Sequence, residues 1–226
     1  MRHELIINGM VITTDNSAAI GEKDLDVVKA PDRITAKFSA RVALLEQWAA
    51  GSEPAALLLQ NFSGGSHWDQ YVDGVEELFH EAGLSPLPIS GSSETNMETL
   101  QSGIAVTIIG KKTREIDSSN LNWFVYGRPL TGQDVLDNPS QIADLKKLHE
   151  LMEEKLIHCI WPVGSKGIAA EMKFMINKTV ASTEPALDLN ASGGPSTAVL
   201  VGVEAQNINA IKERLEGAIH SVKFMD

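Results

Sequence analysis

The sequence has few of the residues and patterns on which several classes of protein depend. It contains one cysteine, Cys159, so neither an intramolecular disulfide nor a multi-cysteine metal site can form. No apolar run approaches the ~18 residues that a membrane-spanning helix needs. The N-terminal segment MRHELIING also lacks the layout of a secretory signal peptide. We therefore expect a cytoplasmic protein that does not associate with membranes.

Common catalytic motifs are missing as well. There is no P-loop, no GxGxxG dinucleotide fingerprint and no GxSxG nucleophile elbow. The six histidines show neither HExxH spacing nor clustering, so a zinc enzyme is not indicated. Cys159 lies in the apolar segment LIHCIWPV, which predicts a buried strand residue and not a reactive thiol. The sequence gives no support for a covalent mechanism.

Basic residues are scarce relative to acidic ones. Thirty Asp and Glu residues outnumber 19 Lys and Arg residues, which gives a net charge of −11 and disfavours nucleic acid as a partner. The first 110 residues hold 15 acids and 6 bases, whereas the remainder holds 15 and 13. A solvated acidic surface explains this excess simply. If the acidic half binds phosphate groups, however, it needs a divalent cation, and Mg²⁺ is the expected one.

The spacing of apolar residues predicts alternating strands and helices. Ile34, Phe38 and Val42 begin a helical stripe that ends before Gly51, and Ser66 is the predicted N-cap of the next helix. The segment at 179–196 is predicted to be a polar loop. The predicted strands are 5–14, 26–29, 55–62, 104–110, 121–127, 157–163, 196–203 and 218–225, and the predicted helices are 34–50, 66–82, 140–155, 164–178 and 205–217.

This alternation is typical of an α/β or α+β fold, and 226 residues with 43% apolar content can bury a sizeable core. The change in charge balance near residue 111 predicts two domains, 1–112 and 113–226. Two such domains would place a ligand cleft between them.

A polar loop is predicted after Pro88, where small residues surround the carboxylate of Glu94 in the segment ISGSSETN. Backbone amides in such a loop can face an anion, and the carboxylate can hold the metal that accompanies a phosphate. A plain connection between two strands explains the segment equally well. Further carboxylates are predicted at or near the ends of elements, namely Asp15, Asp32 and Glu46. Each alone is explained as a surface acid, but together they provide oxygen ligands for Mg²⁺ bridging phosphates.

Taken in order, these elements resemble the superfamily of aminoimidazole ribonucleotide (AIR) synthetase, selenophosphate synthetase, thiamine-monophosphate kinase and the hydrogenase-maturation dehydratase. The resemblance spans nearly the whole chain, through TTDNSAAIG, LEQWAAGSEP, QNFSGG, GSSETN, PVGSKGIAAEM and LNASGGPSTAVLVGV. It implies an AIR synthase-like fold with an N-terminal sheet-and-helix domain (1–112) that forms a dimeric barrel and a shortened C-terminal α/β domain (113–226). It also implies an ATP and Mg²⁺ site in the N-terminal domain.

The resemblance assigns roles to particular residues. They are the metal ligands Asp15, Glu46 and Glu94, the nucleotide contacts Asn16, Asn61, Thr95 and Asn96, and the catalytic residues Lys29, Asp32 and Arg41. Asp32 is expected either to bind metal or to orient the acceptor hydroxyl, whereas Lys29 and Arg41 would offset charge on the transferred phosphoryl group. Two departures stand out. Glu46 replaces the usual aspartate, and Ser92 and Ser93 replace two glycines.

Within this superfamily, segments such as SARVALLE and ISGSSETN are most similar to the compact α-ribazole kinases of cobamide salvage. That similarity implies a cytoplasmic, homodimeric kinase that uses ATP to phosphorylate a nucleoside-like alcohol. Two alternatives remain open. One is another ATP-dependent enzyme of this superfamily with a different acceptor, and the other is a nucleotide-binding regulator without catalytic activity.

Overall fold

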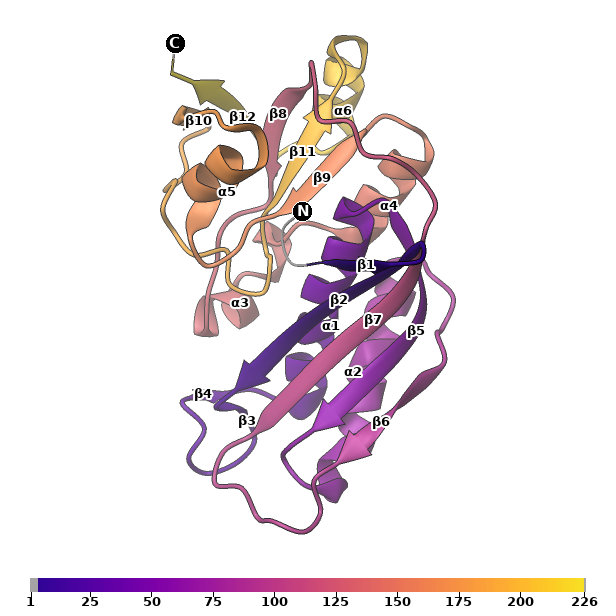
Figure 1. The fold of residues 1–226 in the computed structure, drawn as a ribbon. Coiled ribbons are helices and arrows are strands. Elements are labelled where there is room, and N and C mark those ends of the chain that lie inside the picture. The colour runs from indigo at the N-terminus through magenta and orange to yellow at the C-terminus, as the bar shows by residue number, and fades with distance from the viewer. Residues whose placement is uncertain (1–3, 226) are drawn as a thin grey trace. The chain divides into compact units, whose positions relative to one another are not determined.

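The computed structural model describes residues 4–225, which form two compact units divided between Glu115 and Ile116. Figure 1 shows the N-terminal unit in indigo to magenta and the C-terminal unit in pink through orange to yellow. Both units combine a five-stranded sheet with helices, as predicted for a mixed α/β chain. No helix within residues 4–225 has the length and apolar character that crossing a membrane requires.

The N-terminal sheet has the strand order β1-β2-β7-β5-β6. Its strands are β1 (Leu5–Ile7), β2 (Met10–Ala18), β5 (Ser52–Asn61), β6 (Ile89–Ser93) and β7 (Gly103–Lys112). Strands β5 and β6 pair in parallel, and the other neighbours are antiparallel. A separate parallel pair consists of β3 (Ile20–Gly21) and β4 (Val28–Lys29).

The single strand predicted at 5–14 is in fact a hairpin. Asn8 and Gly9 have φ of 49° and 77°, the left-handed values that a tight two-residue hairpin turn requires. Strand β2 then continues to Ala18 because its pairing with β7 extends from Met10 to that residue. Asp15 and Asn16 therefore lie within a strand, and the prediction that they follow its end was wrong.

Helices α1 (Asp32–Ala49) and α2 (Trp68–Glu81) lie on the same face of this sheet (Figure 1). Hydrogen bonds fix α1 on the sheet, because Thr13 Oγ1 donates to the Ala43 carbonyl over 2.8 Å and Gln47 Nε2 donates to the Val11 carbonyl over 3.0 Å. The buried core between the layers includes Leu44, Trp48, Leu57, Leu59, Val75, Phe79, Val106 and Ile108.

Ser66 does not cap α2, contrary to prediction. It lies in the 3₁₀ turn Gly65–His67, which leads into α2 without a side-chain capping hydrogen bond. The predicted polar loop after Pro88 is also different, because residues Ile89–Ser93 form β6 at the edge of the sheet. Its register pairs Leu57 with Ile89 and Asn61 with Ser93, so the backbone of this polar segment is ordered by β5.

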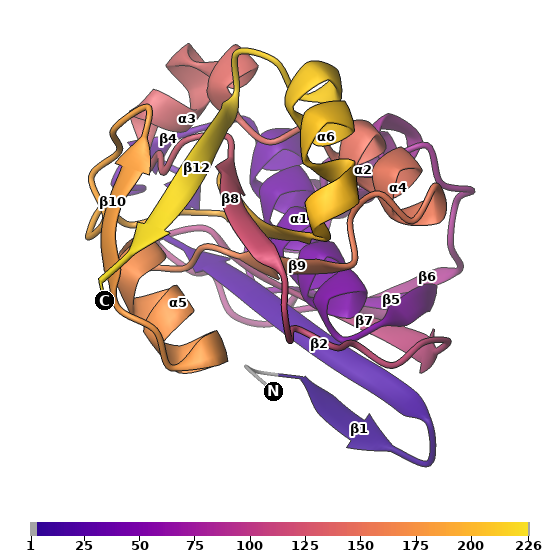
Figure 2. The same ribbon diagram turned by 90° about the horizontal axis from the view of Figure 1, so that it is seen from above.

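The C-terminal unit has an antiparallel sheet of order β10-β12-β8-β11-β9, and Figure 2 shows β12 between β10 and β8. Its strands are β8 (Asn122–Tyr126), β9 (Cys159–Pro162), β10 (Val180–Glu184), β11 (Val199–Val203) and β12 (Ile219–Phe224). Its helices are α3 (Gln133–Asp137), α4 (Leu145–Glu153), α5 (Gly167–Ile176) and α6 (Ile208–Arg214).

Two predictions for this unit need correction and one is confirmed. Helix α4 begins only at Leu145 because Asp144 caps it, with its carboxylate accepting from the Lys147 N–H over 3.0 Å. The polar segment 179–196 includes β10, which is held in the sheet by β12. Cys159 is 2% exposed in β9 and packs in the core of the unit with Ile168 and Met172 of α5.

We predict that Gly74→Ala destabilises the N-terminal unit. Helices α1 and α2 approach so closely that a Cβ at Gly74 would lie 2.0 Å from the Arg33 carbonyl oxygen. Overpacking against backbone costs about 1–3 kcal/mol, which outweighs the ~1 kcal/mol that alanine gains over glycine in a helix. Chemical denaturation would measure the loss. Glu76→Ala, on the exposed side of the same helix, is the control, and equal stability of the two variants would contradict the prediction.

Candidate active site

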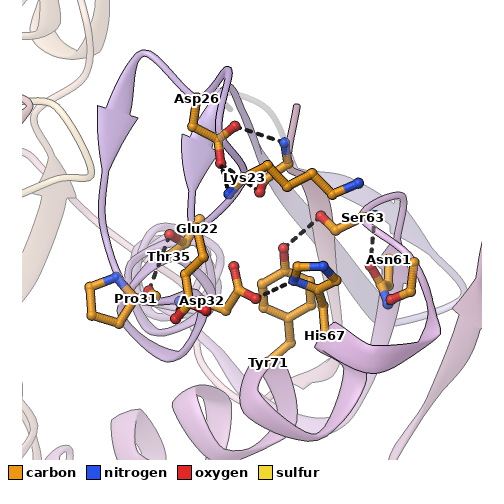
Figure 3. Close-up of polar contacts among 12 residues, drawn as sticks. Glu22, Lys23, Asp26, Pro31, Asp32, Thr35, Asn61, Ser63, His67 and Tyr71 are labelled. Carbon is orange, nitrogen blue, oxygen red and sulfur yellow. Dashed lines mark hydrogen bonds and ion pairs between the residues drawn. The ribbon is translucent and has the colours of Figure 1, made fainter. Parts of the chain in front are cut away.

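The candidate site lies where several segments meet at one end of the N-terminal sheet. The strand register places Ser17, Ile104, Asn61 and Ser93 side by side across β2, β7, β5 and β6. Consequently β2, β5 and β6 end where β7 begins. The connections that leave these strands carry most of the polar residues described below. Figure 3 shows the part of this site around Asp26, Asp32, Asn61 and His67 in close-up.

Asn61 anchors the loop between β5 and α2. Its side chain is 1% exposed, and its Oδ1 accepts from the Ser63 N–H over 2.8 Å. Its Nδ2 donates to the Gly64 carbonyl over 2.7 Å and to Ser93 Oγ over 3.0 Å. Asn61 therefore fixes this loop against the end of β6, and Ser93, one of the two serines that replace glycines, provides one of the acceptors.

Tyr71 and Ser63 form a buried hydrogen-bonded pair in the site. Their hydroxyl groups are hydrogen bonded over 2.7 Å, and Ser63 Oγ also accepts from the Gly103 N–H over 2.9 Å. Burial raises the pKa of Tyr71 to about 12, with the Ser63 hydrogen bond opposing the shift. Tyr71 is therefore a neutral phenol near pH 7. Its ring stacks against His67 with centroids 6.2 Å apart.

Asp32 and His67 form a buried acid–imidazole pair. Asp32 begins α1 and is completely buried, and its Oδ2 contacts Nδ1 of His67 (Figure 3). Asp32 Oδ1 has no hydrogen-bond partner among residues 4–225. Burial raises the pKa of Asp32, the hydrogen bond and charge of His67 lower it, and the charge of Glu22 raises it further, with a net upward shift. Glu22 lies next to Asp32, and its Oε1 accepts a hydrogen bond from the Asp32 N–H over 3.2 Å.

A second buried acid, Asp26, has the opposite environment. It accepts from the Ser102 N–H and Ser102 Oγ, both over 2.7 Å, and from the Lys23 N–H over 2.9 Å. Burial raises the pKa of Asp26, but these hydrogen bonds outweigh it and the pKa is lowered. Asp26 thus fastens the connection between β3 and β4 to the start of β7.

Lys29 and Lys23 strengthen the same connection. Lys29 Nζ donates to the carbonyls of Lys23 and Asp24 over 2.6 and 2.9 Å. Lys23 Nζ donates to the carbonyl and hydroxyl of Thr99 over 2.7 and 2.8 Å. The ammonium group of Lys29, a predicted catalytic residue, is therefore bound to backbone carbonyls of its own loop.

Glu94, Thr95 and Asn96 form the turn that follows β6. Glu94 N–H donates to the Asn61 carbonyl over 2.8 Å, and Glu94 Oε1 accepts from the N–H groups of Asn96 and Met97 over 2.6 and 3.1 Å. These bonds lower the pKa of Glu94. Thr95 and Asn96 are exposed, and Thr95 Cγ2 lies 3.4 Å from the position of a Cβ on Gly65. The structure therefore brings the predicted segments QNFSGG and GSSETN together.

The remaining predicted residues are more dispersed. Asp15 is partly exposed on the helix-facing side of β2, whereas Asn16 is exposed on the other side. Arg41 and Glu46 in α1 are each 5% exposed. Because Val11 contacts Gln47 and Thr13 contacts Ala43, β2 runs antiparallel to α1. Asp15 therefore lies beside an earlier turn of the helix than Glu46.

Within residues 4–225, no group of three or more His, Cys, Asp or Glu side chains is placed to hold a metal ion. Magnesium bound with a nucleotide, however, needs only one or two carboxylates, because waters and phosphate oxygens complete its coordination. Asp15 and Glu94 fit that requirement because both are partly exposed. Glu46 is accessible only to a small extent.

We predict opposite effects on stability when the two buried acids are changed to their amides. Asp26→Asn should lower the free energy of unfolding at pH 7 by about 1–3 kcal/mol, since it removes charge-assisted hydrogen bonds. Asp32→Asn should raise it, because the folded protein no longer holds a desolvated carboxylate.

The direction in which each carboxyl group changes stability with pH follows from the direction of its pKa shift. The raised pKa of Asp32 gives stability at low pH that is lost as pH rises through the folded value, whereas the lowered pKa of Asp26 gives stability at higher pH that is lost on acidification. Denaturant titrations at a series of pH values from about 3 to 8, a range that includes ordinary carboxyl pKa values, would measure how the free energy of unfolding of each variant and of the wild type changes with pH. The assignment of Asp32 fails if its asparagine variant is less stable than the wild type at pH 7.

Comparison with known proteins shows similarity in structure but not in sequence. No protein-family model and no curated protein matches the sequence. Among solved structures, hydrogenase maturation protein HypE is similar with a TM-score of 0.63 and 12% identity, over 98% of this chain and 82% of HypE. Thiamine monophosphate kinase from Aquifex aeolicus also has a TM-score of 0.63 and 12% identity, over 98% of this chain and 86% of the kinase.

A third similar structure is T. maritima PurL complexed with AMPPCP, with a TM-score of 0.60 and 11% identity over 97% of this chain. The match covers 41% of PurL, so this chain spans about two fifths of that protein. HypE in complex with ATP is similar as well, with a TM-score of 0.60. At these identities the similarity establishes the fold. The chain therefore has the mixed α/β fold seen in HypE, in thiamine monophosphate kinase and in the matched part of PurL.

Proposed function

We propose that this protein is a Mg²⁺-dependent phosphotransferase that moves the γ-phosphoryl group of ATP to the hydroxyl of a nucleoside-like alcohol, with α-ribazole as the favoured acceptor. The observation that carries the proposal is the fold shared with a thiamine monophosphate kinase and with proteins solved holding ATP or AMPPCP. The adjoining loops at Gly65 and Thr95 support a phosphate site at the same end of the sheet.

The proposed ligands of Mg²⁺ are Asp15, Glu46 and Glu94. When bound, the ion would neutralise charge on the phosphate oxygens. The exposed side chains of Thr95, Asn96 and Asn16 would contact the nucleotide. Asn61 would act through the loop that it anchors, and Lys29 likewise through the β3–β4 connection. Arg41 is proposed to offset negative charge during transfer.

The proposed enzyme is a homodimer that pairs the uncovered faces of two N-terminal sheets. Helices α1 and α2 both lie on the opposite face (Figure 1), and Leu5, Ile7 and Met10 are 56%, 49% and 48% exposed. The register extends this apolar surface inward, because Ile12 pairs with both Leu5 and Ile109. A second copy would remove this surface from water, at about 25 cal/mol per Å² of apolar area.

We expect ADP release that depends on both Mg²⁺ and acceptor. With purified protein, ATP and α-ribazole, mass spectrometry should show α-ribazole gaining one phosphoryl group for each ADP formed. Asp15→Asn and Glu94→Gln should each weaken Mg²⁺-dependent ATP binding by at least about tenfold, or ~1.4 kcal/mol. Calorimetry would measure this, with Glu98→Gln as the matched control because Glu98 is exposed in the same segment.

The alternatives give different results. Phosphorylation of another compound from a cell extract would identify an ATP-dependent enzyme with a different acceptor. Binding of ATP without modification of any acceptor would support a nucleotide-binding regulator. Unchanged binding of Mg²⁺ and ATP in both carboxylate variants would overturn the proposed metal ligands.

The proposed dimer predicts that a charged side chain at the centre of the sheet face opposite α1 and α2 prevents dimerisation. Thr107 lies there between Thr14 and Leu58 on the neighbouring strands. Thr107→Arg should convert the dimer to monomer, because burying an unpaired guanidinium is costly. Sedimentation would measure the mass, and Thr179→Arg, at an exposed position of the C-terminal unit, is the control. A monomeric wild type, or a dimeric Thr107→Arg variant, would rule out this interface.

A further inference from the structure

His67 has the geometry of a proton acceptor. Its Nδ1 faces the carboxylate of Asp32, and its Nε2 has no hydrogen-bond partner among residues 4–225. The side chain is 18% exposed, so Nε2 can be reached from solvent. Because the carboxylate accepts from Nδ1, the neutral ring carries its proton there and leaves a lone pair on Nε2. Sequence patterns did not single out this histidine.

The environment of Asp32 is costly for a residue with a purely structural role. The side chain is fully buried, one carboxylate oxygen has no partner among the described residues, and Glu22 accepts from the Asp32 N–H. A neutral amide could accept the same hydrogen bond from His67 without burying a charge. What a carboxylate adds is stabilisation of the imidazolium that forms when Nε2 takes up a proton.

The position of His67 connects this pair with the proposed phosphate site. His67 ends the 3₁₀ turn that begins at Gly65, and Gly65 lies against Thr95 in the turn after β6. Stacking on Tyr71 and the contact with Asp32 fix the ring between α1 and α2 (Figure 3). The titratable groups facing the pair are Glu22 from the β3–β4 connection and Tyr71 from α2.

We propose that His67 is the catalytic base of this site and that Asp32 is its positioning residue. The proposal rests on the phosphotransferase function proposed above. The acceptor hydroxyl gives its proton to Nε2 of His67 while its oxygen forms a bond to the γ-phosphorus of ATP. The bond from that phosphorus to the bridging oxygen breaks, and ADP leaves with the electron pair. The proton on His67 then passes to solvent, so the products are the phosphorylated alcohol, ADP and one proton.

The first test separates catalysis from binding. With ATP and α-ribazole, His67→Gln should lower kcat about 100-fold, as expected for loss of a general base, while ATP affinity stays unchanged. Asp32→Asn should lower kcat by about tenfold with little change in KM, since the base remains but its imidazolium loses the carboxylate that stabilises it. Exogenous imidazole should restore part of the activity to His67→Gly. His80→Gln, on the exposed side of α2, is the control and should match the wild type. Equal kcat in His67→Gln and the wild type would overturn the proposal.

The second test does not depend on knowing the acceptor. Diethyl pyrocarbonate modifies accessible imidazole nitrogens, and peptide mass spectrometry gives separate rates for His67 and His80. Mg²⁺ with AMPPCP should slow modification of His67 at least about threefold and leave His80 unchanged, because the γ-phosphate would occupy the space before Nε2. If calorimetry detects AMPPCP binding but His67 is not protected, the role of His67 is wrong and the proposed function stands. If AMPPCP does not bind, the proposed function is wrong, and the inference fails with it.

Discussion

The register of β7 with its two neighbours determines where the polar groups of the candidate site meet. Pairing of β7 with β2 and β5 places Ser17, Ile104 and Asn61 in one row, and pairing of β5 with β6 adds Ser93. A shift by one residue would turn Asn61 away from the helix side and bury different side chains. The apolar residues Leu57, Leu59, Val106 and Ile108 oppose such a shift because they are fully buried under α1 and α2. Core packing therefore fixes the site.

The site combines buried polar groups that stabilise the fold with one carboxylate whose burial lowers the stability of the fold. Asp26 and Asn61 are satisfied by several hydrogen bonds and join segments that are distant in the sequence. Asp32 is buried as completely, but one of its oxygens has no partner in the described part of the chain. Costly arrangements of this kind are concentrated at functional sites, where the charge of the group has a use. The contrast between Asp26 and Asp32 separates the framework of the candidate site from the pair to which we assign a catalytic role.

A shared fold does not by itself determine the chemistry of a protein. This chain has 11–14% identity to the similar solved structures, yet it retains the strand and helix arrangement of a thiamine monophosphate kinase and of HypE. Ser93 replaces a glycine expected from the sequence motif and accepts a hydrogen bond from Asn61, so the departure has a structural use. His67 lies in the same loop. These residues place the candidate site at the end of the N-terminal sheet.

The sequence by itself determined the elements that depend on local spacing. The stripe from Ile34 to Trp48 predicted α1, Gly51 and Gly83 marked helix ends, and the motifs from TTDN to ASGGPST suggested the fold that the similar solved structures share. It did not determine β6, because Ile89–Ser93 is small and polar and becomes a strand only through parallel pairing with β5. It also placed Asp15 after a strand that continues through it.

Only the tertiary structure decided the partner of each buried acid. Asp32 and His67 are 35 residues apart, Asp26 and Ser102 are 76 apart, and neither pair belongs to a motif with fixed spacing. Periodicity reports which face of an element is buried, but not which distant element covers it. The environments that shift the pKa values of these two carboxylates in opposite directions form only when loops distant in the sequence meet at the end of the folded sheet.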